Sequence, residues 1–309
     1  MSISAELIAR GIVRGLHVAA SLSVFGSVLC HASIASIALK TAAPTTIRRV
    51  QRLTSGLIRL SLAIAALAGA VWLLLEAVYI TGGDRIADGM AVIWPVIYET
   101  NFGHLLVVRL ALLLLAVVVF GGGAGRARAS VAAGLAGVAV ALEAGLGHGA
   151  AMPGAEGEIL LVSLLLHLLA AGAWLGGLAS LMIVIDALPY DKAREAASRF
   201  SKVGITCVLT LAATTAVQGW DLVGGFAGLF EAAYGRIAFA KLLLFVLLLG
   251  FAAANRFRFT PALTSARACS ARMQLHRSIL AEALIGVLVI VLAGLLVNLP
   301  PNMNMKPGP

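Results

Sequence analysis

The stretch His167-Leu-Leu-Ala-Ala-Gly-Ala-Trp174-Leu-Gly-Gly177 places one histidine and one tryptophan in an otherwise apolar run rich in small residues. In a helix one face of this stretch carries His167, Ala170, Ala171, Trp174 and Leu178. An imidazole inside a membrane helix needs a polar partner, and Gly172 with Gly176 would let a second helix approach closely enough to supply one. The stretch therefore predicts either a functional histidine or one that merely hydrogen-bonds a carbonyl between helices.

The composition indicates a membrane protein. Of the 309 residues, 61% are hydrophobic and only 12% are charged, which is too little charge to cover a soluble globule. The net charge of +9 comes from residues in short loops between apolar segments. We therefore expect these basic residues to set the orientation of the protein in the membrane rather than to bind nucleic acid. The three cysteines form no CxxC motif, so neither a disulfide nor a thiolate metal cluster is implied.

Eight apolar segments are long enough to span a bilayer, which predicts an all-α, polytopic protein. The segments are 12–39, 56–80, 102–122, 130–148, 159–185, 203–222, 236–254 and 279–298. The alternate loops 40–52, 126–128, 192–202 and 256–277 are basic, whereas 82–101, 149–158 and 221–235 are acidic or nearly neutral. The positive-inside rule then places both termini on the periplasmic side, although Arg10 and Arg14 oppose this weakly.

The two halves of the chain, residues 1–157 and 158–309, show a repeat. Leu16-His17-Val-Ala-Ala parallels Leu166-His167-Leu-Leu-Ala, and Phe102-Gly103 with Arg109 parallels Tyr234-Gly235 with Lys241. Four spans per half is an even number, so we expect two four-helix halves with the same orientation, related by an axis along the membrane normal. His17 and His167 would then lie at matching depths.

Polar residues within the spans collect in the predicted outer half. They are His17, Glu76, His104, Arg109, Glu143, His148, His167 and Lys241. This one-sided arrangement predicts a site reached by water from outside. Glu76 and Glu143 could be metal-site carboxylates, proton carriers, or ion-pair partners of Arg109 and Lys241. His104 at the interface needs no special role, and Trp174 is typical of packing.

Several side chains suit a transition metal. Imidazoles bind such metals readily, and methionine thioethers select soft ions such as Cu(I). His148 is followed by Met152 and Pro153 at a helix end, and Met303 and Met305 form a Met-x-Met pair near the C-terminus. These tail methionines have no core to fill. They could bind a metal, or the tail could simply be disordered.

Short motifs resemble, in order, the CopD domain of bacterial copper resistance and copper import proteins. They are 167–177, Arg199-Phe200-Ser201, Tyr234-Gly235-Arg236 with Lys241, Ala254-Asn255-Arg256, Pro261, and Arg277-Ser278 with Glu282. The resemblance covers about the last 150 residues well. Thr100-Asn101-Phe102-Gly103 with Arg109, and Gly147-His148-Gly149, look like the corresponding landmarks of the first half.

The resemblance implies an eight-span inner-membrane protein that works with a periplasmic copper carrier of the CopC type and moves copper toward the cytoplasm. It assigns a copper-handling role to His148 and His167. Some members carry a CopC domain on the same chain. This chain has no room for one, so we expect a separate carrier. Val297 and Asn298 stand where the repeat would put a partner for His148, so a symmetric pair of sites is not expected.

The leading hypothesis is a copper ion transport site between the halves, with ligands from His17, His148 and His167 and from Met152, and with Met303 and Met305 capturing the ion. One alternative is a membrane cytochrome in which His17 and His167 bind haem. Another is a scaffold with no transport role. We expect no enzyme activity, and no GxxxxGK[ST] motif points to ATP.

Overall fold

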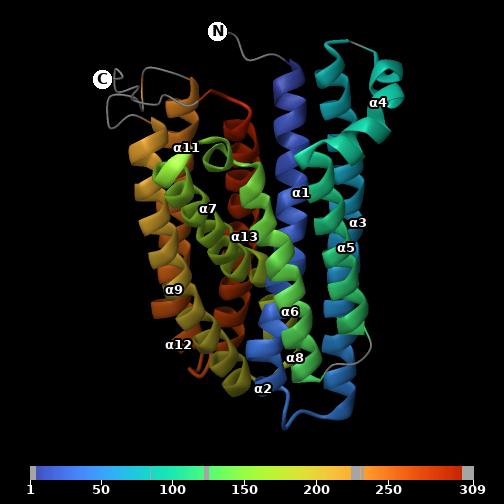
Figure 1. Ribbon diagram of the computed structural model, residues 1–309. Coiled ribbons are helices and arrows are strands. Elements are labelled where there is room, and N and C mark those ends of the chain that lie inside the picture. Colours follow the sequence, from blue (N-terminus) through green and yellow to red (C-terminus); the bar gives the residue numbers. More distant parts are fainter. Residues whose placement is uncertain (1–4, 84, 122–124, 224–229, 231–232, 301–309) are drawn as a thin grey trace.

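The computed structural model describes residues 5–83, 85–121, 125–223, 230 and 233–300, and every regular element in these ranges is a helix. Eight helical runs are long and apolar enough to cross a membrane. They form an upright bundle in which the start of the first run and the end of the last lie at the same end (Figure 1). The prediction of an all-α protein with eight membrane spans is confirmed.

Several of the eight runs contain more than one helical segment. The first four are α1 (Ala5–Cys30) with η1 (His31–Ala35) and α2 (Ser36–Ala38), α3 (Pro44–Thr81), α5 (Asn101–Gly121), and α6 (Arg126–Ala141) with η2 (Leu142–Leu146). The last four are α7 (Gly154–Trp174) with η4 (Leu175–Gly177) and α8 (Leu178–Ala187), α9 (Tyr190–Val223), α11 (Ala233–Ala254) with η5 (Asn255–Phe259) and α12 (Thr260–Ala262), and α13 (Ala268–Val297). Outside the spans lie α4 (Ile86–Glu99) and η3 (His148–Ala151).

The helices extend well beyond the predicted apolar segments at the basic end of the bundle. Most of the predicted loop 40–52 belongs to α3, which begins at Pro44, a residue suited to the first helical turn. The predicted loop 192–202 lies entirely within α9. An apolar segment indicates only the part of a helix that lies in lipid. The backbone hydrogen bonds of the helix continue beyond it into water. The predicted boundaries were therefore wrong at this end.

The predicted loop 82–101 contains an additional helix, α4, which the sequence analysis missed. It folds back onto α3 and α5, because Gly89 packs on Val78 and Gly103 packs on the backbone of residues 96–97. Four large apolar side chains spaced four residues apart are exposed on it, namely Ile86, Met90, Trp94 and Tyr98. Such a face is typical of a helix that lies in the membrane interface.

The first span is the most deeply buried of the eight and packs against α3, α6, α7, α8 and α13. Glycines allow this central position. Gly26 contacts the backbone of Gly172, Gly176 and Gly177, and Gly15 lies against Val291 of α13. Small residues let helix backbones approach closely. The prediction that Gly172 and Gly176 admit a second helix is confirmed, and that helix is α1.

Candidate metal-handling site

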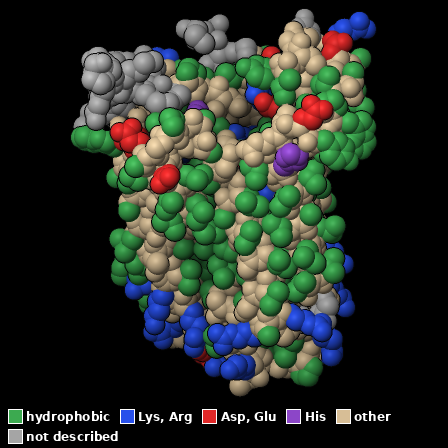
Figure 2. Space-filling view, in the orientation of Figure 1, with side chains coloured by type: hydrophobic (Ala, Val, Ile, Leu, Met, Phe, Trp, Pro, Cys, Tyr) green, Lys and Arg blue, Asp and Glu red, His purple; other side chains and the backbone are tan. Residues whose placement is uncertain are grey.

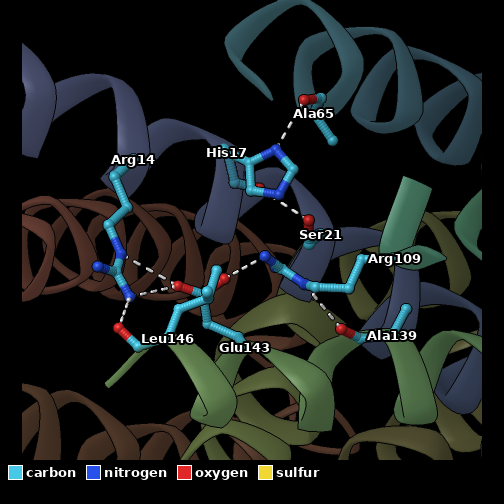
Figure 3. A network of polar contacts seen from close by, with 8 residues as sticks. All are labelled: Arg14, His17, Ser21, Ala65, Arg109, Ala139, Glu143 and Leu146. Carbon is cyan, nitrogen blue, oxygen red and sulfur yellow. Dashed lines mark hydrogen bonds and ion pairs between the residues drawn. The ribbon is translucent and has the colours of Figure 1, made fainter. Parts of the chain in front are cut away.

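A network of three buried, charged side chains joins α1, α5 and η2 (Figure 3). From α1, Arg14 donates two hydrogen bonds to Glu143 of η2, at 3.1 and 2.8 Å, and a third to the carbonyl of Leu146 at 3.1 Å. From α5, Arg109 pairs with the other carboxylate oxygen of Glu143 and donates to the carbonyl of Ala139 at 3.0 Å. One carboxylate thus serves two guanidinium groups.

This network carries one net positive charge inside the membrane-spanning bundle. Because Glu143 pairs with Arg109, the predicted ion pair between these two residues is confirmed. From the sequence, Arg14 was interpreted only as an orientation signal, and its part in the network was not predicted. The available signal was its position three residues before His17, which puts both side chains on one side of α1. The ring of Trp72 also lies under the Arg14 guanidinium, with 5.0 Å to the centroid.

His17 is fully buried beside this network, with Ala65 on one side and the Arg109–Glu143 pair on the other (Figure 3). Its Nδ1 lies 2.8 Å from the carbonyl oxygen of Ala65 in α3. A carbonyl can only accept, so Nδ1 carries the proton and Nε2 keeps its lone pair. Nε2 is buried and has no hydrogen-bond partner among the described residues.

His167 is anchored in the same way to the following span. Its Nδ1 lies 2.9 Å from Oγ1 of Thr214 in α9. The Thr214 hydroxyl in turn donates to the carbonyl of Thr210 at 2.8 Å, so the imidazole must donate through Nδ1. No described residue hydrogen-bonds Nε2, and the ring borders a cavity. The predicted need for a polar partner is met by Thr214.

His148 lies outside the spans, in η3, and its Nε2 is buried with no hydrogen-bond partner among the described residues. Its ring packs on Tyr234 with 6.3 Å between centroids. Burial lowers the pKa of His148 below its usual value, which favours the neutral imidazole that a metal requires.

His17 and His167 therefore share one tautomer, with Nδ1 engaged and the Nε2 lone pair available, and the Nε2 of His148 likewise has no partner among the described residues. This is the form in which an imidazole binds a transition metal while its other nitrogen fixes the ring. His104 differs, because its Nε2 lies 2.9 Å from the Tyr98 carbonyl and so carries the proton. Among the described residues, no group of three or more His, Cys, Asp or Glu is close enough to hold a metal ion. The histidines suit copper individually but do not converge on one closed site.

A cavity of about 210 Å³, here called the His167 cavity, lies between α1, α7, α9, α11 and α13. The rest of its lining is mainly apolar, and its polar lining residues are Arg14, Glu143, His167, Thr215, Gln218, Tyr234 and Lys241. Neither His17 nor His148 lines it, although His148 reaches its wall through Tyr234. Lys241 also lines this cavity and makes no ion pair with any described residue.

The remaining predicted residues have other surroundings. Glu76 pairs with Arg10 at 2.9 Å rather than with Arg109 or Lys241, so that part of the prediction was wrong. α1 and α3 lie side by side and bring this pair together, which sequence spacing alone cannot show. Met152 ends η3 and packs in a small cluster with Leu160 and Tyr234. Met303 and Met305 lie outside the described residues.

Two copper-related family profiles match the chain along most of its length. Residues 6–158 match the profile described as Copper resistance protein D-like, N-terminal domain, and residues 194–296 match Copper resistance protein D. The chain belongs to the copper resistance protein D family. The predicted resemblance to CopD proteins is thus confirmed, and the two matches lie in the order in which the CopD landmarks occur in the sequence.

Three relatives agree with the CopD assignment. The chain is 27% identical to Copper resistance protein D of Pseudomonas syringae pv. tomato over 254 residues, which is 78% of this chain and 82% of the relative. It is 26% identical to Inner membrane protein YebZ of Escherichia coli K12 over 94% of this chain and 97% of that one. It is also 30% identical to Copper transport protein CutJ of Bacillus subtilis over 47% of this chain and 26% of that relative. No solved structure matches. The chain is a copper-related, multi-pass membrane protein.

Proposed function

We propose that this CopD-family protein carries copper ions across the bacterial inner membrane, from the periplasm toward the cytoplasm, and that His17, His148 and His167 are its imidazole ligands. The names of two relatives, a copper transport protein and an inner membrane protein, support the cargo and the location. The observation that carries the proposal is that His17 and His167 share a tautomer held through Nδ1, and that no described residue hydrogen-bonds the Nε2 of any of the three histidines.

The arrangement suits passage rather than storage. A transported ion must bind strongly enough to enter and weakly enough to leave. Imidazoles that do not converge offer few ligands at a time, and the positive charges of Arg14 and Arg109 lower the affinity of the region for any cation. Copper would therefore pass from one imidazole to another. Glu143 partly offsets the positive charge.

Delivery to the outer face completes the proposal. A separate periplasmic carrier of the CopC type would bring copper to the end where the termini lie. Met152, together with Met303 and Met305, would offer thioethers that accept Cu(I) from the carrier. Met152 lies four residues after His148, which makes the pair a plausible first acceptor.

Copper retention tests the three histidines. We expect the purified protein, loaded with Cu(I) under reducing conditions and dialysed, to retain copper, and His17→Ala, His148→Ala and His167→Ala to weaken retention by roughly tenfold or more each. Elemental analysis of copper and iron in the same samples gives the readout. His104→Ala is the matched control, because its Nε2 already donates to Tyr98.

Unchanged copper retention in all three variants would refute the ligand assignment. Stoichiometric iron with a Soret absorption band would instead show a haem protein. His17 makes haem ligation difficult in this structure. Its ring packs 5.7 Å from the Trp72 ring, and an added Cβ at Gly69 would lie only 3.1 Å from its Nδ1.

Thiol labelling tests the orientation. On the face seen in Figure 2, Lys and Arg side chains gather at the end of the bundle where α2, α8 and α12 lie, and the positive-inside rule assigns this end to the cytoplasm. Cys269 is exposed at the start of α13, while Cys30 and Cys207 are buried. We expect a membrane-impermeant maleimide to leave Cys269 unlabelled in spheroplasts and to label it after permeabilisation.

The control for orientation is Glu99→Cys on α4 in a Cys269→Ser background. Glu99 is exposed at the opposite end, so this thiol should react in intact spheroplasts. Labelling of Cys269 in spheroplasts, with Glu99→Cys protected, would mean that the termini face the cytoplasm.

A further inference from the structure

A second cavity of about 250 Å³, here called the Glu282 cavity, lies at the basic end of the bundle between α8, α9, α11 and α13. Its polar lining is Ser201, Asn255, Arg256, Thr260 and Glu282. Trp174 borders both this cavity and the His167 cavity. The indole ring, which is 2% exposed, is therefore part of the partition between the two cavities.

Glu282 is a buried carboxylate without a cationic partner. It is 1% exposed, accepts a hydrogen bond from Asn255 Nδ2 at 2.8 Å, lines the same cavity as Trp174, and makes no ion pair with any described residue. The other charged side chain on the described cavity lining is Arg256, which donates to Ser201 Oγ at 2.9 Å. An isolated carboxylate inside a membrane protein is costly unless it binds a cation.

The chemistry of the lining indicates which cation that is. None of the described residues on this cavity is His, Cys or Met, the side chains that hold copper. A hard metal ion takes about six oxygen ligands, which this mainly apolar lining does not offer. A proton needs only the carboxylate. Glu282 is therefore suited to bind a proton rather than the copper cargo.

Asn255, which donates to Glu282, and Trp174, which shares its cavity, both stand where a helix changes its geometry. Helix α7 ends at Trp174, and the 3₁₀ segment η4 follows at once. Asn255 is the first residue of the π-helical segment η5. Such interruptions weaken the regular hydrogen-bond ladder, are frequent at functional sites and let a helix bend. The Glu282 cavity thus borders two deformable points in the helices.

We propose that Glu282 is a proton-binding group that controls Trp174 as a gate between the two cavities. When ionised, Glu282 accepts a charge-assisted hydrogen bond from the indole and holds the partition closed. When a hydronium ion transfers its proton to Glu282, water is released and the neutral acid binds the indole more weakly, so the partition opens. Loss of the proton restores the closed state. The inference rests on the proposed copper transport.

Copper uptake into proteoliposomes, at varied pH on the Glu282 side, tests the gate. We expect the wild-type rate of copper uptake to rise by about tenfold when that pH is lowered enough to protonate Glu282. This is the size of effect expected from losing one charge-assisted hydrogen bond. Glu282→Gln, a neutral mimic of the protonated acid, and Trp174→Phe, which lacks the indole N–H, should both transport copper without this pH dependence. Glu195→Gln, on the exposed start of α9, should keep it.

Infrared spectroscopy of the copper-free protein supplies an independent readout. A carboxylic-acid carbonyl band that titrates with pH in the wild type, disappears in Glu282→Gln and persists in Trp174→Phe supports proton binding at Glu282. Absence of that band, or wild-type pH dependence retained in both variants, overturns the inference. A titrating band in a protein that moves no copper would refute the proposed transport while leaving the proton-binding group established.

Discussion

Replacing Glu143 with glutamine is expected to lower the free energy of unfolding by about 3–5 kcal/mol, the usual cost of breaking a buried ion pair by removing one partner. Glutamine keeps the shape of the side chain but removes its charge. Arg14 and Arg109, both buried, would then face each other across a neutral group. SDS titration of the protein in mixed micelles, followed by circular dichroism, measures the loss.

Two controls sharpen this test. Glu195→Gln removes a carboxylate that also faces two cations, Lys192 and Arg199, but at an exposed position, and should leave the unfolding transition unchanged. A triple variant with methionine at Arg14 and Arg109 and leucine at Glu143 should recover much of the stability, because no unpaired charge remains. An unaltered transition in Glu143→Gln would show that the network contributes nothing to stability.

Replacing Gly26 with leucine is expected to prevent α1 from packing in the centre of the bundle. A Cβ at this position would overlap backbone atoms of 172, 176 and 177, which cannot move away as the end of a side chain can. Overpacking of a core lowers the free energy of unfolding by about 1–3 kcal/mol when neighbouring side chains can move aside. Because this clash is with backbone, we expect a larger loss. Size-exclusion chromatography of a fluorescent fusion should show loss of the monodisperse peak.

The matched control is Gly134→Leu in α6, where an added Cβ meets nothing within 4 Å. That variant should give the wild-type peak. Gly26→Ala provides a graded version, since a single methyl group already meets the same backbone. A normal peak for Gly26→Leu would mean that α1 and η4 are farther apart in the membrane than in this structure.

The candidate site was only partly predictable. His17, His148 and His167 stood out because polar side chains are rare in apolar spans. The common tautomer of His17 and His167 could not be inferred, because it depends on Ala65 and Thr214 in other parts of the fold. Glu282 appeared only as part of a family landmark. Its isolation became visible once its surroundings were known.

The sequence by itself determined the eight membrane spans and the uneven distribution of basic residues, because burial in lipid demands long apolar helices and leaves charge for the ends. The tertiary structure alone decided which charges pair. Glu76 binds Arg10, and Glu143 binds Arg14 and Arg109. In each pair the two residues belong to different spans and are at least 34 residues apart in the chain. It also decided that Trp174 separates two cavities. Hydropathy is a property of each segment alone, whereas ion pairs and cavities depend on how distant segments pack together.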